Sequence, residues 1–255
     1  HDMQEEYLLL GNGSNVLFAD KGYDGVILKL AGDFESIERK DNTVTVGAAK
    51  LLSGTSAFAT DQGLAGLEFA SGIPGSIGGA VFMNAGAYGG EMKDIVKSVR
   101  VVSPDGSEVK ELAAEELGFG YRTSAIQASG AIVTGVTLEL TPDDRDAIAE
   151  RVSELTKKRN SKQPVQYPSA GSTFKRPVGG YAAALIEDAG LKSFTVGGAQ
   201  VSEKHSGFVI NIGGATCADV LELMRQVRQK VYDNSGIVLE PEVRIIGDEL
   251  GEFGL

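Results

Sequence analysis

The chain has 255 residues, 42% of them apolar, so it can bury a substantial core and has room for one large domain or two ordinary ones. Its formal net charge of −11 argues against broad affinity for nucleic acid or anionic membranes, because both need an excess of Lys and Arg. The single cysteine, Cys217, excludes an intramolecular disulfide and a thiolate zinc cluster, and no apolar run approaches the ~20 residues of a membrane span. We therefore expect a cytoplasmic protein without membrane insertion and without a metal.

The first part of the chain predicts mainly strands. Residues 1–6 are typical of the polar end of a helix and residues 7–10 of a buried strand, which predicts that the chain begins within a domain. Further strands are expected at 16–18 and 26–28, in hairpins over 34–47 and 94–112, and at 131–140 and 242–246. Together with the helices below, they indicate an α+β fold.

Helices are expected over 51–62, closed by Gly63, over 142–159, over 181–188 and around 220–231. In the second of these, Ile148, Val152 and Leu155 fall at helical spacing. Acidic residues lie near its start and basic residues at its end, as the helix dipole favours. Residues 160–180 are rich in Pro, Ser and Gly, so we expect a junction there, with one domain over 1–160 and another over 161–255.

Two glycine clusters point to a nucleotide. The first glycine loop comprises Gly11, Asn12, Gly13, Ser14 and Asn15; its amides suit phosphate oxygens, although a plain tight turn explains it equally well. Residues 66–90 hold eight glycines among apolar residues, so they should be buried and are no linker. Within them lies the second glycine loop, residues 72–79, whose members of interest are Gly72, Ile73, Gly75, Ser76, Gly78 and Gly79.

The second glycine loop is the more specific of the two. Pro74 is predicted in the first turn of a helix whose N-terminus favours negative charge, and the small residues let a backbone approach a pyrophosphate. A glycine-rich packing contact between helix and sheet is the alternative. Both loops together fit a bound dinucleotide, yet neither has Rossmann spacing and no Walker lysine follows.

Six segments then carry a resemblance. In order, they are GNGSN, GLEFASGIPGSIGGAVFMNAGAYGG, YRTS, YPSAGSTFKRP, GGAQVSEKHSGFVIN and LEPEVR. They closely resemble the conserved segments of the UDP-N-acetylenolpyruvoylglucosamine reductase (MurB) family, and the resemblance runs from about Tyr7 to Gly247. The spacing from Arg122 to Ser172 is similar to that of the shorter, type II subgroup. The family's N-terminal segment has no counterpart here.

The resemblance implies an FAD-binding fold of the MurB and vanillyl-alcohol-oxidase type, truncated at its start, and a smaller C-terminal α+β substrate domain. It implies non-covalent FAD held by the two glycine loops, with Asn84, Gly86 and Tyr88 near the flavin. NADPH would reduce the FAD. Hydride would then reach C3 of the enolpyruvyl group of a UDP-sugar and a proton C2, giving UDP-N-acetylmuramate for peptidoglycan synthesis.

Three catalytic positions match the family. Arg122 would stabilise charge on the substrate carboxylate, Ser172 would protonate C2, and Glu242 would help to polarise the enolpyruvyl group. From the residues alone, they read as a surface arginine in an ion pair, a turn serine and a strand-edge carboxylate beside Arg244. Glu240 is a weaker candidate than Glu242. The substrate-binding residues implied by the resemblance are Tyr121, Lys162, Lys175 and Arg176.

Other interpretations stay open. Another FAD-dependent oxidoreductase of the same fold would not explain Ser172 together with Glu242, and no His or Cys in the glycine loops could tether FAD. A catalytically inactive nucleotide-binding module is the second rival. His205, beside Lys204, reads as structural or exposed and not as an acid or base. We expect a monomer or weak homo-oligomer whose partner is a small UDP-sugar, and no nucleic acid.

Overall fold

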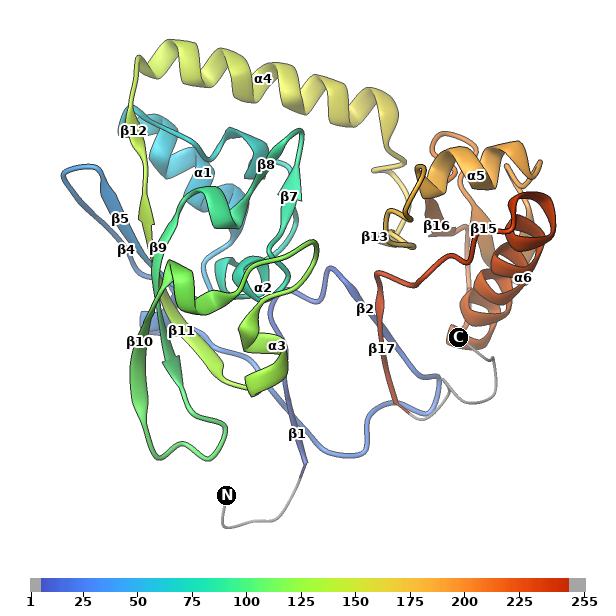
Figure 1. Ribbon diagram of the computed structural model, residues 1–255, viewed down its shortest axis with the longest axis horizontal. Coiled ribbons are helices and arrows are strands. Elements are labelled where there is room, and N and C mark those ends of the chain that lie inside the picture. The colour runs from blue at the N-terminus through green and yellow to red at the C-terminus, as the bar shows by residue number, and fades with distance from the viewer. Residues whose placement is uncertain (1–5, 248–255) are drawn as a thin grey trace. The chain divides into compact units, whose positions relative to one another are not determined.

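The structure is a computed structural model that describes residues 6–247 (Figure 1). Its residues divide into two compact units. Among the described residues, unit 1 contains residues 6–13 together with Gly25–Arg159, and unit 2 contains Ser14–Asp24 together with residues 160–247. The second division lies one residue from the expected domain boundary. The transfer of residues 14–24 to unit 2 was not expected.

Unit 1 is built on a five-stranded antiparallel sheet with the order β10-β9-β11-β5-β4. The strands are β4 (Ile37–Lys40), β5 (Thr43–Gly47), β9 (Val96–Val102), β10 (Val109–Ala113) and β11 (Ile132–Glu139). Val136 of β11 pairs with Val99 of β9 on one side and with Val46 of β5 on the other, and all three side chains are buried. These β-branched residues form the centre of the core of unit 1.

Helices and short strands complete unit 1. The α-helices are α1 (Leu52–Asp61), α2 (Ile77–Phe82), α3 (Ala125–Ser129) and α4 (Arg145–Lys162), whose last three residues belong to unit 2. The 3-10 helices are η1 (Gly32–Glu35), η2 (Glu68–Ala70), η3 (Met92–Asp94) and η4 (Ala114–Leu117). The strand pairs are β1 (Tyr7–Leu9) with β3 (Val26–Leu28), β6 (Leu64–Ala65) with β12 (Thr141–Pro142), and β7 (Gly86–Ala87) with β8 (Gly90–Glu91). Helix α2 packs against β5 and β11.

Unit 2 contains a four-stranded antiparallel sheet with the order β13-β16-β15-β14. Its strands are β13 (Ser169–Ser172), β14 (Thr195–Val196), β15 (Ala199–Val201) and β16 (Phe208–Asn211), and its helices are α5 (Ala182–Asp188) and α6 (Cys217–Ser235). Helix α6 packs on β14 and β15. Met224, Val227 and Val231, three residues of its expected apolar seam, are fully buried, and Val220 packs at the edge of the same core.

Two contacts explain why residues 14–24 belong to unit 2. Strand β2 (Val16–Phe18) pairs in parallel with β17 (Arg244–Ile246). The carboxylate of Asp20 accepts hydrogen bonds from the amides of Cys217 (2.7 Å) and Ala218 (3.0 Å) at the start of α6. A carboxylate at a helix N-terminus satisfies otherwise unpaired amides and interacts favourably with the helix dipole.

Several expected boundaries shift. Residues 34–35 lie in η1 and not in a strand, and the helix expected from residue 142 begins at Arg145 and continues to Lys162. The prediction that Pro74 lies in the first turn of a helix is wrong, because residues 75–77 first bond to the backbone around Leu51 and Ser76 then caps α2. The helix end expected over residues 1–6 falls, except for Glu6, outside the described residues.

No helix within residues 6–247 is both long enough and apolar enough to cross a membrane. In the same part of the chain, His, Cys, Asp and Glu side chains form no group of three or more that could hold a metal ion.

Candidate active site

The two glycine loops meet in unit 1. The side-chain amide of Asn12 donates a hydrogen bond to the carbonyl of Pro74. Gly11 lies so close to the second loop that a Cβ at this position would be 2.7 Å from Oγ of Ser76, a distance that side chains do not tolerate. Residues 11–13 and 72–79, far apart in sequence, therefore form one surface, which we call the glycine surface.

The glycine surface offers hydrogen-bond donors. Within the described part of the chain, no hydrogen bond is made by the amides of Gly11, Asn12, Gly13, Gly75 and Ser76. Converging amides in a loop without bulky side chains suit phosphate oxygens. The residues present therefore fit the pyrophosphate of a dinucleotide such as FAD.

The remaining members of the second glycine loop contribute shape. The amide of Ile73 bonds to the carbonyl of Ala70 (3.0 Å) and that of Gly78 to the carbonyl of Ala48 (2.9 Å). The amide of Gly79 bonds to Oγ of Ser76 (3.3 Å) at the start of α2. These three amides are already paired, so they are not donors for a ligand.

Arg122 lies in a tight turn of unit 1. Gly120 and Thr123 exchange backbone hydrogen bonds of 3.1 and 3.3 Å across it, and Arg122 itself has a positive φ of 55°. Its guanidinium donates to the carbonyl of Gly86 (3.0 Å) and, more weakly, to that of Asn84 (3.5 Å). The carbon Cζ stands 5.0 Å from the centroid of the exposed Tyr121 ring. The structure thus brings four predicted site residues together.

The side chain of Asn84 supports the Arg122 turn through hydrogen bonds. It is fully buried, and its side-chain amide donates to Oε2 of Glu91 (2.5 Å) and to the carbonyl of Gly120 (2.9 Å). Its side-chain oxygen accepts a hydrogen bond from the amide of Lys93 (3.0 Å). Because both donors and the acceptor are used within the protein, the Asn84 side chain positions the Arg122 turn, and its predicted place near the flavin stays a prediction.

Glu91 was not predicted, because one carboxylate after a Gly-Gly pair gives no recognisable pattern. The pKa of Glu91 lies below its usual value, chiefly because Lys93 donates a hydrogen bond to its carboxylate. Asn84 and the positive charge of Arg122 lower this pKa further, against the opposing effect of burial. An ionised Glu91 therefore links Asn84 to the charge of Arg122.

Backbone strain is concentrated at these positions. Five non-glycine residues within 6–247 have a positive φ, and Asn84, Tyr88 and Arg122 are three of them. Such conformations cost about 1–3 kcal/mol each and persist where the surrounding structure holds them in place, often at functional sites. A sequence pattern does not reveal them, since Asn alone of the three tolerates the left-handed region well.

Unit 2 brings Ser172 and Glu242 onto neighbouring segments. Ser172 ends β13, and the carbonyl of the next residue, Thr173, accepts a hydrogen bond from the amide of Glu242 (2.8 Å). The carbonyl of Glu242 accepts in turn from the side chain of Asn15 (3.1 Å), whose own carbonyl accepts from the amide of Arg244 (3.0 Å). Asn15 and Ser14 are therefore part of unit 2, whereas residues 11–13 of the same loop are part of unit 1.

The Ser172 side chain is exposed, and its hydroxyl forms no hydrogen bond within residues 6–247. A serine hydroxyl is a weak acid, so the activating proton chain required by its predicted role stays a prediction. Arg122 belongs to unit 1 and Ser172 and Glu242 to unit 2, so their gathering around one substrate also stays a prediction.

The other predicted substrate residues lie in unit 2. Lys162 is the exposed last residue of α4. The Nζ atom of Lys175 lies 3.3 Å from Oε2 of Glu240, so the weaker candidate carboxylate is used in an exposed ion pair. The guanidinium carbon of Arg176 lies 4.1 Å from the centroid of the Tyr181 ring.

His205 has a structural environment. Its Nδ1 accepts a hydrogen bond from the amide of Gly207 (3.1 Å), and its ring meets Phe208 edge to face, with 4.9 Å between centroids. Burial lowers the pKa of His205, which favours the neutral ring that this hydrogen bond requires.

Comparison with known proteins adds the family. Residues 163–246 match the family described as UDP-N-acetylenolpyruvoylglucosamine reductase, C-terminal domain, and residues 1–111 match the FAD binding domain family. A UDP-N-acetylenolpyruvoylglucosamine reductase of Clostridium perfringens strain SM101 is 51% identical over 241 residues, which are 94% of this chain and 79% of that protein. The chain belongs to the UDP-N-acetylenolpyruvoylglucosamine reductase family. The resemblance seen in the sequence is thereby confirmed.

Two further relatives agree with this assignment. The UDP-N-acetylenolpyruvoylglucosamine reductase of Alkaliphilus oremlandii is 50% identical over 246 residues, 96% of this chain and 81% of that protein. The crystal structure of the reductase (MurB) from Thermus caldophilus has a TM-score of 0.84 at 40% identity and covers 96% of this chain and 86% of that one. The predicted α+β fold, an FAD-binding region followed by a MurB-type C-terminal domain, is confirmed.

Proposed function

We propose that the chain is an NADPH-dependent flavoenzyme that reduces UDP-N-acetylglucosamine enolpyruvate to UDP-N-acetylmuramate during peptidoglycan synthesis. The observation that carries the proposal is the glycine surface of unit 1, in a chain that belongs to the reductase family. A cytoplasmic location, a monomeric or weakly oligomeric state and the lack of a nucleic-acid partner are finer proposals that rest on the sequence alone.

The unpaired amides of Gly11, Asn12, Gly13, Gly75 and Ser76 would hold the FAD pyrophosphate. When bound, FAD supplies a carrier that accepts hydride from NADPH and delivers it to the substrate. We expect the protein to hold this carrier without a covalent link, as the family resemblance implies, and the glycine loops contain no His or Cys that could tether it.

Arg122 would serve the substrate carboxylate. Addition of hydride to C3 of the enolpyruvyl group places negative charge on C2 and its carboxylate, and a fixed cation there lowers the barrier. The carbonyls of Gly86 and Asn84 fix one edge of the guanidinium. A guanidinium orientated in this way needs little reorganisation when charge develops.

Ser172 would deliver the proton to C2, and Glu242 would polarise the enolpyruvyl group. Lys175 can exchange its exposed partner Glu240 for a substrate phosphate at little cost, because exposed ion pairs contribute little to stability. Tyr121, Lys162 and Arg176 would complete the substrate contacts.

Oxidation of NADPH by the FAD-loaded protein, with and without UDP-N-acetylglucosamine enolpyruvate, tests the proposal. We expect NADPH alone to bleach the flavin once, and the UDP-sugar to permit many turnovers. Bleaching without turnover would indicate another FAD-dependent oxidoreductase of the same fold. A protein that binds FAD but is not bleached would be an inactive nucleotide-binding module.

A further inference from the structure

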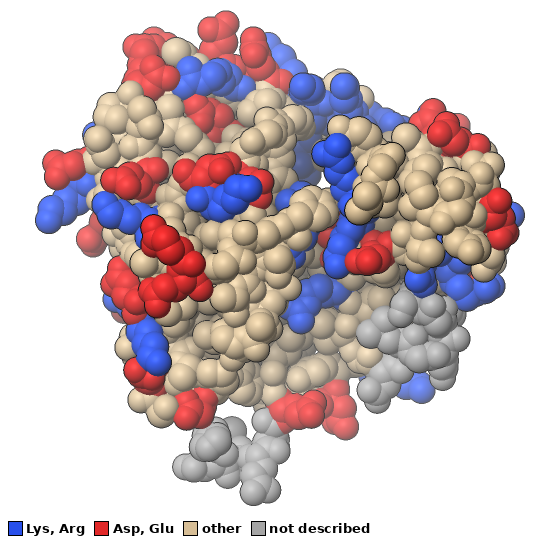
Figure 2. Space-filling model, viewed as in Figure 1, with Lys and Arg blue, Asp and Glu red and all other residues tan. Residues whose placement is uncertain are grey.

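Helix α4 has few apolar contacts for its length. Of its 18 residues, only Ile148 is buried. Figure 2 shows acidic side chains over the start of this helix and Lys and Arg side chains toward its end. Tertiary packing of an apolar face supplies most of the stability of protein helices, so α4 must be held against unit 1 largely by polar contacts.

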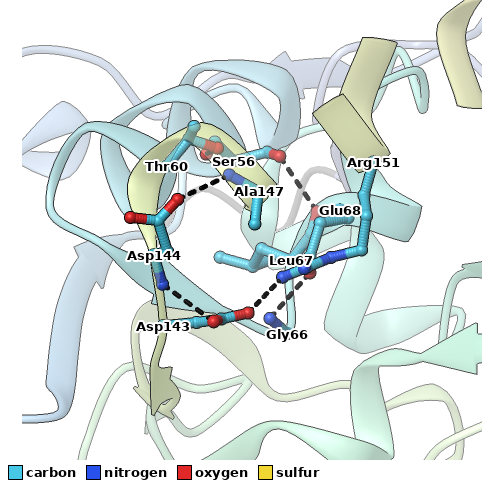
Figure 3. Close-up of polar contacts among 9 residues, drawn as sticks. All are labelled: Ser56, Thr60, Gly66, Leu67, Glu68, Asp143, Asp144, Ala147 and Arg151. Atoms are coloured by element: carbon cyan, nitrogen blue, oxygen red, sulfur yellow. Dashed lines mark hydrogen bonds and ion pairs between the residues drawn. The ribbon is translucent and has the colours of Figure 1, made fainter. Parts of the chain in front are cut away.

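Three charged residues supply the main contact, which we call the α4 clamp: Glu68, Asp143 and Arg151 (Figure 3). Arg151 lies 2.8–2.9 Å from Oε1 of Glu68 and 2.6 Å from Oδ2 of Asp143. The other carboxylate oxygen of Glu68 accepts the amide of Gly66 (2.7 Å), and only 14% of the Glu68 side chain is exposed. A largely buried, fully hydrogen-bonded carboxylate fixes its arginine more firmly than a surface pair does.

Two turns beyond the clamp, α4 reaches the ligand-facing loops of unit 1. The Nζ atom of Lys158 stands 5.6 Å from the centroid of the Tyr88 ring. Arg159 lies directly on the second glycine loop, where a Cβ at Gly72 would be 2.7 Å from Cδ of Arg159. Gly72 is therefore required for the approach of Arg159, in addition to any approach of a nucleotide.

Arg159 carries a half-buried charge. Its guanidinium forms no hydrogen bond or ion pair with any residue from 6 to 247, and its one electrostatic partner there is Tyr88. Burial lowers the pKa of Arg159, a sign that the protein alone does not offset the cost of desolvating this charge. Arg159 is thus a partly desolvated cation that has no carboxylate partner within residues 6–247, and it lies on the glycine surface, whose free amides have no acceptors there. An anionic ligand would satisfy both.

We propose that Arg159 binds an anionic group of FAD, and that the α4 clamp is a positioning device that holds Arg159 against the second glycine loop. This inference rests on one part of the proposed function, the binding of FAD, and not on the reaction of the UDP-sugar. The anion is either the pyrophosphate or the reduced isoalloxazine, and different measurements identify each.

FAD titration of the FAD-depleted protein, followed by flavin fluorescence, tests the first part. If the anion is the pyrophosphate, Arg159→Gln should weaken FAD binding roughly 10- to 100-fold, the value of a hydrogen bond to a charged group, and Arg159→Lys should restore part of the loss. The control is Lys157→Gln, which removes an exposed charge from the same turn of α4.

The two sources of the anion give different results. If the pyrophosphate is bound, Arg159→Gln weakens ADP and oxidised FAD alike. If the reduced flavin is bound, oxidised FAD binds normally and the midpoint potential of the bound flavin falls. Unchanged affinity together with an unchanged potential would overturn the proposal.

A double-mutant cycle tests the clamp. Arg151→Met should weaken FAD binding about 3- to 10-fold in the native protein, or lower the flavin midpoint potential if the reduced flavin is the bound anion, and cause no further change in the Arg159→Gln background, because the clamp acts through Arg159. The matched control is Arg145→Met, because Arg145 lies on the same helix α4 and its exposed ion pair is with Asp61 of α1. Additive losses would show that Arg151 is merely structural. These results do not depend on turnover of the UDP-sugar, so they stand or fall apart from the proposed reaction.

Discussion

The two units hold their predicted site residues in different ways. In unit 1, Arg122 is fixed by carbonyls and Asn84 is saturated with hydrogen bonds, both in left-handed backbone conformations. In unit 2, regular backbone pairing brings Ser172 and Glu242 to neighbouring segments, and the Ser172 hydroxyl forms no hydrogen bond within residues 6–247. The comparison suggests that unit 1 is pre-organised for charge stabilisation, whereas unit 2 presents a group that acquires its partners with the substrate.

The largest expected effect belongs to Ser172→Ala. Product formation should fall about 10²- to 10⁴-fold, the usual contribution of a general acid, while NADPH still reduces the flavin. Because the hydroxyl has no partner within residues 6–247, the free energy of unfolding should change by less than about 0.5 kcal/mol.

Rapid-mixing absorbance of the flavin and urea unfolding separate these two properties. Ser169→Ala, at the other end of β13, is the control and should leave turnover unchanged. Full turnover in Ser172→Ala would refute Ser172 as the proton donor. A large loss of stability would show that the Ser172 hydroxyl, like the side chain of Asn84 in unit 1, is held by the protein.

Arg122→Lys should lower kcat about 10²-fold with a smaller change in KM. Lysine keeps the charge but cannot bond to the carbonyls of Gly86 and Asn84 and face the substrate at the same time. Steady-state kinetics measure the split, with Arg145→Lys on the exposed face of α4 as the control. An unaffected kcat would mean that catalysis does not use the guanidinium held by the carbonyls of Gly86 and Asn84.

The sequence revealed the parts of the site more readily than their arrangement. Glycine composition pointed to the two loops that meet in the glycine surface, because small residues are needed wherever a backbone approaches closely. Residues 14–15 of the first glycine loop belong to unit 2 because β2 pairs with β17. This contact joins segments far apart in the sequence, so no local pattern predicts it. The positions of Arg122 and Ser172 came from resemblance, since an isolated Arg or Ser has no distinctive environment in sequence.

Asn84 shows the same limit from another side. The resemblance placed it near the flavin, which stays a prediction, and nothing in the sequence indicated that its side chain bonds to Glu91, Lys93 and Gly120. Arg159 and Glu68 could not be recognised either, because charges on a polar helix and before a glycine cluster are common at exposed positions.

Asn84→Ala tests whether unit 1 is locked. Removal of this fully buried side chain leaves the amide of Lys93 without its acceptor and takes one donor from the carboxylate of Glu91 and one from the carbonyl of Gly120, so the free energy of unfolding should fall by about 2–3 kcal/mol. Urea unfolding of the FAD-free protein measures this loss, and the exposed Asn42→Ala of the same unit is the control. If stability is unchanged and only flavin binding weakens, Asn84 is a ligand contact and does not lock unit 1.

The smallest expected effect concerns His205, the side chain of unit 2 that is committed to the backbone in the way Asn84 is in unit 1. Its folded pKa is lowered, mainly by burial, so the unfolded chain takes up a proton first, near the ordinary pKa of about 6.5. Stability is therefore fully present above that pH and falls as the pH drops below it, by about 1 kcal/mol for the hydrogen bond to Gly207.

His205→Gln, which does not titrate, should remove this slope between about pH 7 and 5 in urea unfolding followed at several pH values. His1, the other histidine, is present in both proteins and cancels in the comparison. A slope that persists in the variant would assign it to other groups. His205 would then contribute packing against Phe208 and not the pH dependence.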